Sequence, residues 1–124
     1  MSDPKYCVIL YVESTTVSAD FYTQLLGRPP IEVSPGFALF VLASGVTFGM
    51  WAKHAVEPTA VLKGGGAEMA LSLDNNDEVD TYYAIWKQRG IKIVQSPTKM
   101  DFGYTFVAQD PDEHRIRVFA PSQP

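Results

Sequence analysis

The chain has 124 residues, of which 46% are hydrophobic and 19% are charged. This composition is typical of one packed globular domain and is too apolar for a disordered chain. Ten basic and fourteen acidic residues give a formal net charge of −4, and no basic stripe of the kind that binds a phosphate backbone is present. We therefore expect no nucleic-acid partner, and the acidic balance favours a cationic or neutral ligand.

The sequence carries no signal for export or membrane insertion. Its first five residues lack the basic and apolar regions of a signal peptide. No apolar run approaches the roughly 20 residues of a membrane-spanning helix. We therefore expect a cytoplasmic protein with no membrane partner. Cys7 is the single cysteine, which excludes an internal disulfide.

The first half of the chain predicts a strand, a helix and three further strands. Residues 6–12 form an apolar run rich in β-branched and aromatic side chains, which predicts a buried strand. Residues 14–16 offer N-cap hydroxyls for a helix whose apolar residues repeat at helical spacing until Gly27. The three strands are predicted over residues 31–33, 37–42 and 46–52, with turns at Pro35-Gly36 and Ser44-Gly45.

The same order of elements then repeats. Residues 55–65 contain Pro58 and the first two of the three consecutive glycines 64–66, and this composition predicts a linker. Beyond it we predict a strand over 68–73, a helix capped by residues 74–76 and ending at Gly90, and strands over 91–94, 104–108 and 115–119. The sequence therefore predicts an α+β fold, one domain over residues 1–124 built from two βαβββ modules, about 5–54 and 66–120.

Three segments carry a resemblance to a known family. The helices end in DFYTQLLG and YAIWKQRG, and the chain closes with FGYTFVAQDPDEHRIRVF. The chain resembles the vicinal oxygen chelate superfamily of glyoxalases, bleomycin resistance proteins and extradiol dioxygenases. The resemblance implies curved mixed sheets around a concave site, and a homodimer whose sites are shared between subunits. The segment FGMWAKHAVEPTA is most similar to the metal-free phenazine-binding type of antibiotic resistance protein.

Metal-using members of this superfamily place ligands on the first and last strand of each module. Carried over by resemblance, these positions fall at Cys7, Gly49, Glu68 and Arg117. Gly49 has no side chain, and the Arg117 guanidinium has no lone pair for a metal. Catalytic zinc usually keeps three protein ligands, so we expect no metal cofactor here. Glu68 and Arg117 are instead expected to form a charge-assisted pair across the floor of the site or an ordinary cross-strand pair.

The remaining candidates for ligand binding are mainly aromatic. Strand alternation puts Tyr11 on the side of Cys7, and Trp51 on the side of Gly49. Trp51 is the leading candidate, because flat ligands stack on such rings with about 0.5–1.5 kcal/mol beyond area burial. For each ring, packing in the core is the alternative. The predicted ligand-binding residues are Trp51, Tyr11, Phe40, Phe102, Tyr104, Phe106, Glu68, Arg117 and Phe119.

These observations favour metal-independent sequestration of a small aromatic compound or antibiotic, with no cofactor and no catalytic residue. One alternative is a glyoxalase- or dioxygenase-like enzyme with an atypical metal site, such as Glu68, Cys7 and a residue of the partner chain. Another is metal-free acid-base catalysis by a buried Glu68. His54 and His114 fall outside the ligand positions and are expected to be solvated or bonded locally.

Overall fold

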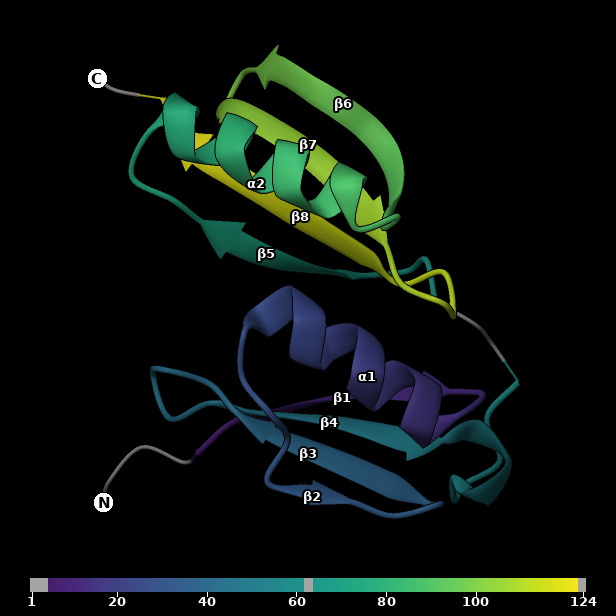
Figure 1. Ribbon diagram of the computed structural model, residues 1–124. Helices are drawn as coiled ribbons and strands as arrows, with labels where there is room; N and C mark the ends of the chain where they lie inside the picture. Colours follow the sequence, from purple (N-terminus) through teal and green to yellow (C-terminus); the bar gives the residue numbers. More distant parts are fainter. Residues whose placement is uncertain (1–4, 62–63, 123–124) are drawn as a thin grey trace. The chain divides into compact units, whose positions relative to one another are not determined.

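Each half of the chain folds as a βαβββ module, a four-stranded sheet with one helix on one face (Figure 1). The computed structural model describes residues 5–61 and 64–122. The chain divides into two compact units, residues 1–63 and 64–124, here called unit 1 and unit 2. Residues 62 and 63 of the expected linker 55–65 lie outside the described residues. The predicted α+β class and the repeated order of elements are confirmed.

Unit 1 contains β1 (Cys7–Val12), α1 (Thr15–Leu26), β2 (Glu32–Val33), β3 (Phe37–Val41), β4 (Thr47–Ala52) and the short 3-10 helix η1 (Lys53–Ala55). The strands follow the order β1-β4-β3-β2 in the sheet. β1 is parallel to β4, and the other neighbours are antiparallel. This arrangement places β1 at one edge of the sheet and the last strand of the module in its interior.

Local chemistry fixes both ends of α1. The Ser14 hydroxyl accepts a hydrogen bond from a first-turn amide at 3.2 Å, which caps the helix. Gly27 has a left-handed φ of 71°, a conformation that strains other residues, and its amide donates to a last-turn carbonyl at 3.0 Å. The buried Tyr22 ring meets Phe48 of β4 edge to face, with ring centroids 4.9 Å apart. α1 therefore covers the face of the sheet that carries Phe48.

Unit 2 contains β5 (Glu68–Ser72), α2 (Asn76–Gln88), β6 (Lys92–Met100), β7 (Gly103–Gln109) and β8 (Arg115–Pro121). Its sheet order, β5-β8-β7-β6, repeats that of unit 1. Asn75 caps α2 by accepting from the Glu78 amide at 2.9 Å and donating to the Glu78 carboxylate at 3.2 Å. Trp86 and Tyr83 of α2 lie 5.4 and 5.5 Å from the Phe106 ring, so α2 covers the Phe106 face.

Two expectations about strands are corrected. β6 extends to Met100, well beyond the predicted 91–94, because Pro97 falls within the register shift between Gln95 and Thr98 on an edge strand, where proline is tolerated. β1 is not buried: Cys7 is exposed and Tyr11 keeps 39% of its surface, since β1 has a neighbour on one side only. Across the described residues, no helix is long and apolar enough to cross a bilayer.

Candidate ligand-binding faces

The four positions that correspond to metal ligands in the superfamily lie on the sheet faces opposite the helices. We call the face opposite the unit's own helix its helix-free face. Cys7 and Gly49 share this face in unit 1, and Glu68 and Arg117 share it in unit 2. In both units the last-strand position pairs with the residue two places beyond the first-strand position. The two modules therefore have the same register, and each residue on one face has a counterpart on the other.

The helix-free face of unit 1 is aromatic. Tyr11 and Trp51 are register partners in neighbouring strands, with ring centroids 6.4 Å apart and an interplanar angle of 81°. Phe37 of β3 is the register partner of Trp51 on its other side. Trp51 is half-buried, so part of its ring is accessible. Three aromatic side chains thus lie in adjacent strands at the same level of this sheet.

Phe37 is a residue that sequence reasoning missed. Its ring lies against Gly49, where an added Cβ would be 2.6 Å from the Phe37 Cζ. The ring therefore occupies space that a metal-ligating side chain at residue 49 would need. The turn pair Ser44-Gly45 could have revealed this neighbour, because a hairpin centred there places Phe37 opposite Trp51.

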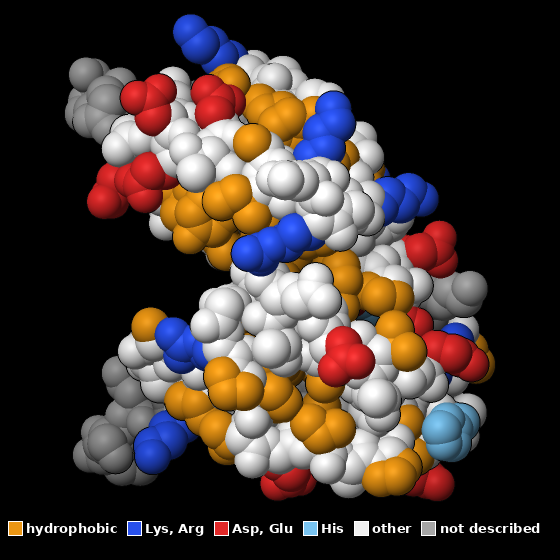
Figure 2. Space-filling view, viewed as in Figure 1, with side chains coloured by type: hydrophobic (Ala, Val, Ile, Leu, Met, Phe, Trp, Pro, Cys, Tyr) orange, Lys and Arg blue, Asp and Glu red, His pale blue; other side chains and the backbone are white. Residues whose placement is uncertain are grey.

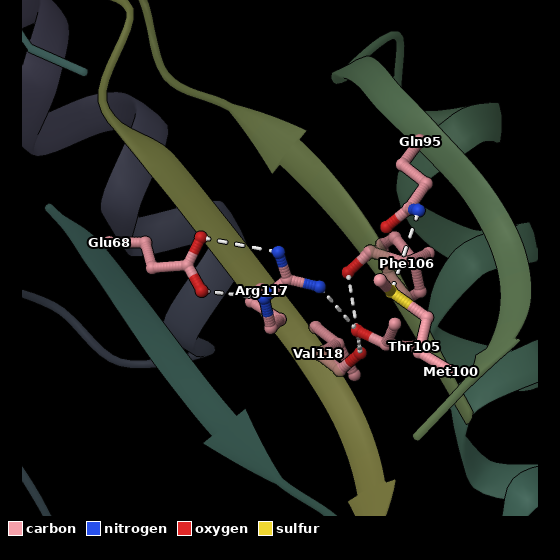
Figure 3. A network of polar contacts seen from close by, with 7 residues as sticks. All are labelled: Glu68, Gln95, Met100, Thr105, Phe106, Arg117 and Val118. Carbon is pink, nitrogen blue, oxygen red and sulfur yellow. Dashed lines mark hydrogen bonds and ion pairs between the residues drawn. The ribbon is translucent and has the colours of Figure 1, made fainter. Parts of the chain in front are cut away.

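The helix-free face of unit 2 carries a polar network instead (Figure 3). Arg117 Nε donates to Glu68 Oε1 at 2.5 Å, and Arg117 Nη2 donates to Glu68 Oε2 at 3.4 Å. Arg117 Nη1 donates to the hydroxyl of Thr105 at 3.2 Å. The Arg117 and Glu68 side chains are 17% and 33% exposed. The predicted pair is therefore present as a two-pronged, charge-assisted contact.

Thr105 is the second residue that sequence reasoning missed. It is fully buried, and its register position in β7 corresponds to that of Phe37 in β3. Unit 1 therefore combines a phenylalanine with a glycine at the two positions where unit 2 combines a threonine with an arginine. The hairpin turn at residues 110–113 would have placed Thr105 on the Arg117 face, had that register been assumed.

Two rings border the network in unit 2. The Arg117 Cζ lies 5.6 Å from the centroid of Phe102, a cation–π distance. Phe102 in turn meets Phe119 edge to face, with centroids 5.9 Å apart. Phe102 is 44% exposed and Phe119 is half-buried. These two predicted residues therefore lie beside Arg117, with ring surface that a ligand can contact.

Three predicted binding residues lie on the opposite faces of their sheets. Phe40 and Phe106 are fully buried on the helix side, where they pack against Phe48 and against α2 respectively. Their rings have no exposed surface, so we reassign them to the cores of their units. Tyr104 also lies on the helix side: its hydroxyl donates to Asp80 of α2 at 2.7 Å.

Tyr104 belongs to a separate depression at the start of α2. This cavity has a volume of about 530 Å³, and its lining includes Asn75, Met100 and Pro121. The register of β7 and β8 puts Tyr104 on the opposite face of the sheet from Arg117, so this cavity is separate from the Arg117 face. Hydrogen bonding to Asp80, together with burial, raises the pKa of Tyr104.

The donor atoms at the four superfamily positions do not suit a metal ion. Gly49 offers none, Arg117 is a cation, and both oxygens of Glu68 accept from Arg117. Cys7 remains, on the exposed edge strand. Within residues 5–61 and 64–122, no group of three or more His, Cys, Asp and Glu side chains is placed to hold a metal. Glu68 is also not the buried carboxylate that acid-base catalysis was expected to need.

His114 is bonded locally, as expected. Its Nδ1 lies 2.8 Å from Asp110 Oδ2. The other carboxylate oxygen of Asp110 accepts from the amides of Asp112 and His114, each at 2.8 Å. Asp110 is 5% exposed, so it organises the turn between β7 and β8 from inside. His54 lies exposed in η1.

Comparisons with known proteins agree on one family. The model of the Glyoxalase/Bleomycin resistance protein/Dioxygenase superfamily matches residues 5–118. The phenazine antibiotic resistance protein EhpR of Enterobacter agglomerans is 30% identical over 113 residues, covering 89% of this chain and 86% of EhpR.

Solved structures share the fold of this chain. The solution structure of protein ATC0852 from Agrobacterium tumefaciens has 49% sequence identity and a TM-score of 0.88, covering 99% of this chain and 100% of that chain. A glyoxalase-related enzyme from Fulvimarina pelagi has a TM-score of 0.83 at 18% identity, covering 96% of this chain and 88% of that one. At that identity the second likeness concerns the fold alone.

Proposed function

Because the chain belongs to the Glyoxalase/Bleomycin resistance protein/Dioxygenase superfamily, we propose that it captures a small aromatic compound of the antibiotic type without a metal and without turnover. The observation that carries this proposal is the exchange of side chains at the superfamily's metal positions. A phenylalanine ring lies over Gly49 beside Trp51, and Arg117 is paired with Glu68. The relative EhpR is a phenazine antibiotic resistance protein, which supports a flat phenazine-like ligand.

The rings of unit 1 suit a flat ligand. Tyr11 and Trp51 stand nearly perpendicular to one another, so a ring stacked on one presents its edge to the other. Both geometries are favourable between aromatic systems, at about 0.5–1.5 kcal/mol each beyond the burial of apolar area. Trp51 has the larger ring system and is held in the interior strand β4, so we assign it the main contact.

A titration with phenazine tests the proposal. The chain has two tryptophans, and Trp86 is 2% exposed in the core of unit 2, so quenching by a ligand on the sheet face should come from Trp51. We expect phenazine to quench the wild-type protein and the Trp86→Phe variant to a similar extent. Trp51→Leu should lose the quenching, and equilibrium dialysis should show the loss of binding itself.

The outcome also separates sequestration from catalysis. Phenazine recovered after long incubation should have an unchanged mass. Undiminished binding by Trp51→Leu would remove the assigned contact, and absence of binding to every phenazine tested would remove the function.

Superfamily membership favours one second candidate, a glyoxalase- or dioxygenase-like enzyme with an atypical metal site. Such a site would need Cys7 and Glu68 together with ligands from a partner chain. Elemental analysis of protein purified without chelators separates the candidates. Stoichiometric zinc, nickel or iron would support the enzyme and contradict metal-independent capture.

We also propose that the protein is a cytoplasmic homodimer. The surface of each unit includes hydrophobic side chains (Figure 2), and in unit 1 several belong to the edge strands. Ile9 and Val33, on β1 and β2, are 42% and 48% exposed. Exposed apolar edge strands are usually covered in stable proteins. Light scattering after size-exclusion chromatography should give twice the chain mass of 13.7 kDa, and a monomer at all concentrations would contradict the dimer.

A further inference from the structure

The helix-free face of unit 2 indicates which kind of aromatic ligand would bind. Resting on the proposed function, we infer that Arg117 binds an anionic oxygen on the ligand, a carboxylate attached to its aromatic ring, and that Thr105 positions Arg117 for this contact. The inference depends on the hydrogen bonds, charges and rings of unit 2 alone.

The charges on this face differ from those of the chain as a whole. The register places Arg115 opposite Glu68, and Lys92 opposite Gln109, which itself pairs with Arg115. Together with Arg117, the strand residues of this face therefore include three basic side chains and one acidic side chain, Glu68. The net charge of the chain is −4, whereas the charged strand residues of this face sum to +2. Such a face favours an anion over the cationic or neutral ligand that the overall composition suggested.

Arg117 keeps hydrogen-bonding capacity after its contacts within the protein. A guanidinium carries five N–H groups. Glu68 accepts one hydrogen bond from Nε and one from Nη2, and Thr105 accepts one from Nη1. In the described part of the chain Arg117 makes no further hydrogen bond, so one N–H on Nη1 and one on Nη2 remain. A carboxylate has two oxygens that can accept from these two groups. Glu68 neutralises part of the charge without occupying these donors.

Thr105 fixes the direction of the contact on Nη1. Its hydroxyl donates to the Val118 carbonyl at 2.9 Å, so its lone pairs are left to accept from Arg117. Because Thr105 is fully buried in β7, this acceptor has a fixed place. Glu68 holds the guanidinium on one side and Thr105 holds it on another, as Figure 3 shows. A donor held in this way loses less conformational entropy when it binds a ligand.

The rings beside Arg117 offer apolar surface to the part of the ligand that carries the carboxylate. Phe102, within cation–π distance of the guanidinium, and Phe119, which meets it edge to face, provide apolar surface next to the free N–H groups. A planar ring that carries a carboxylate matches this combination of apolar and donor groups. A free inorganic anion would use only the donors.

Three phenazines of nearly equal size test the inference by isothermal titration calorimetry at pH 7 and low salt. They are phenazine, phenazine-1-carboxylate and the neutral phenazine-1-carboxamide. The carboxylate should bind at least about tenfold more tightly than the carboxamide, as expected for hydrogen bonds to a charged group. Arg117→Met should bring this ratio to within about twofold of one.

Three further variants test the positioning role of Thr105 and the specificity of the Arg117 effect. Thr105→Val keeps the shape of the side chain but removes the acceptor, so the ratio of carboxylate to carboxamide affinity should fall about threefold. Thr105→Ser keeps the hydroxyl and should retain the wild-type ratio. Lys87→Met removes the same charge from α2 of unit 2 and should leave the ratio unchanged. Thermal unfolding of each variant checks that the fold is retained.

The results distinguish the inference from the function on which it rests. If none of the three compounds binds, the proposed function fails. If all three bind with equal affinity, the proposed function stands and the assignment of Arg117 to a carboxylate is overturned. An Arg117→Met protein that keeps the full preference for the carboxylate would also overturn it.

Discussion

The tip of the Phe37 ring lies against Gly49, so closely that a Cβ at residue 49 would stand 2.6 Å from the Phe37 Cζ. We predict that Gly49→Ala lowers the free energy of unfolding by about 1 kcal/mol, because the ring must tilt away. In a Phe37→Ala background the same substitution should be nearly neutral, which makes the two residues energetically coupled. Urea unfolding of the four proteins in this double-mutant cycle measures the coupling.

Gly66→Ala provides a matched control for that cycle. A Cβ at residue 66 of unit 2 meets nothing within 4 Å, so its effect should not depend on Phe37. Equal costs of Gly49→Ala with and without Phe37 would show that the ring does not restrict residue 49.

The reassignment of Phe106 to the core of unit 2 leads to a second prediction. Phe106→Ala should destabilise the protein by about 3–5 kcal/mol, since it leaves a cavity beneath Trp86 and Tyr83. Phe102→Ala should cost far less stability, because Phe102 is 44% exposed, but it should weaken ligand binding. Unfolding curves and calorimetric titrations of both variants give the comparison. A stable Phe106→Ala protein with weakened binding would reverse the assignment.

Asp110 carries a third prediction, about the turn between β7 and β8. Asp110→Ala should lower stability by about 1–3 kcal/mol, because the amides of Asp112 and His114 lose their acceptor inside the turn. His114→Ala removes only the side-chain contact with Asp110 and should cost less. Guanidinium unfolding of the two variants tests this order, and a larger loss for His114→Ala would contradict it.

The two tyrosines near α2 give a fourth prediction, on pH dependence. Hydrogen bonding to Asp80 and burial raise the pKa of Tyr104 above 10.0, whereas hydrogen bonds with Ser96 and Lys87 lower the pKa of Tyr83. Absorbance at the tyrosinate band should therefore show Tyr83 ionising before Tyr104 as pH rises. Tyr83→Phe should remove the early phase and Tyr104→Phe the late one.

The sign of the stability effect follows from the direction of the Tyr104 shift. A raised pKa in the folded state means that the folded protein holds the proton more tightly. The contribution of Tyr104 to stability is therefore complete below the ordinary pKa of about 10 and is lost as pH rises through the folded pKa. Tyr104→Phe should abolish that part of the alkaline loss, as urea unfolding at several pH values can show.

The fold could be predicted from local chemistry because its boundaries depend on few residues. Ser14, Gly27 and Asn75 mark helix ends through their own hydrogen bonds and backbone angles. β6 was underestimated because Pro97 normally ends a strand, and its tolerance depends on being at an edge, which is a property of the whole sheet.

The faces were harder to predict than the elements. Alternation along one strand separates two faces but does not say which face the helix covers, so it leaves Phe40, Tyr104 and Phe106 as candidates although they lie on the helix side. Register across the hairpins resolves this, because it ties each residue to a neighbour already assigned. Phe37 and Thr105 were missed for the same reason: their importance comes from the partner strand, where Gly49 and Arg117 lie.

The shared register has a consequence for how ligand preference changes in this chain. Residues 7, 37 and 49 of unit 1 correspond one to one with residues 68, 105 and 117 of unit 2. The first trio is Cys, Phe and Gly, and the second is Glu, Thr and Arg. Each trio lies on the side of its sheet away from the helix, so its chemistry can be rewritten while the residues packed beneath the helix stay as they are. The polarity of each helix-free face is thus determined by three residues on a common scaffold. Three substitutions separate the apolar trio from the charged one.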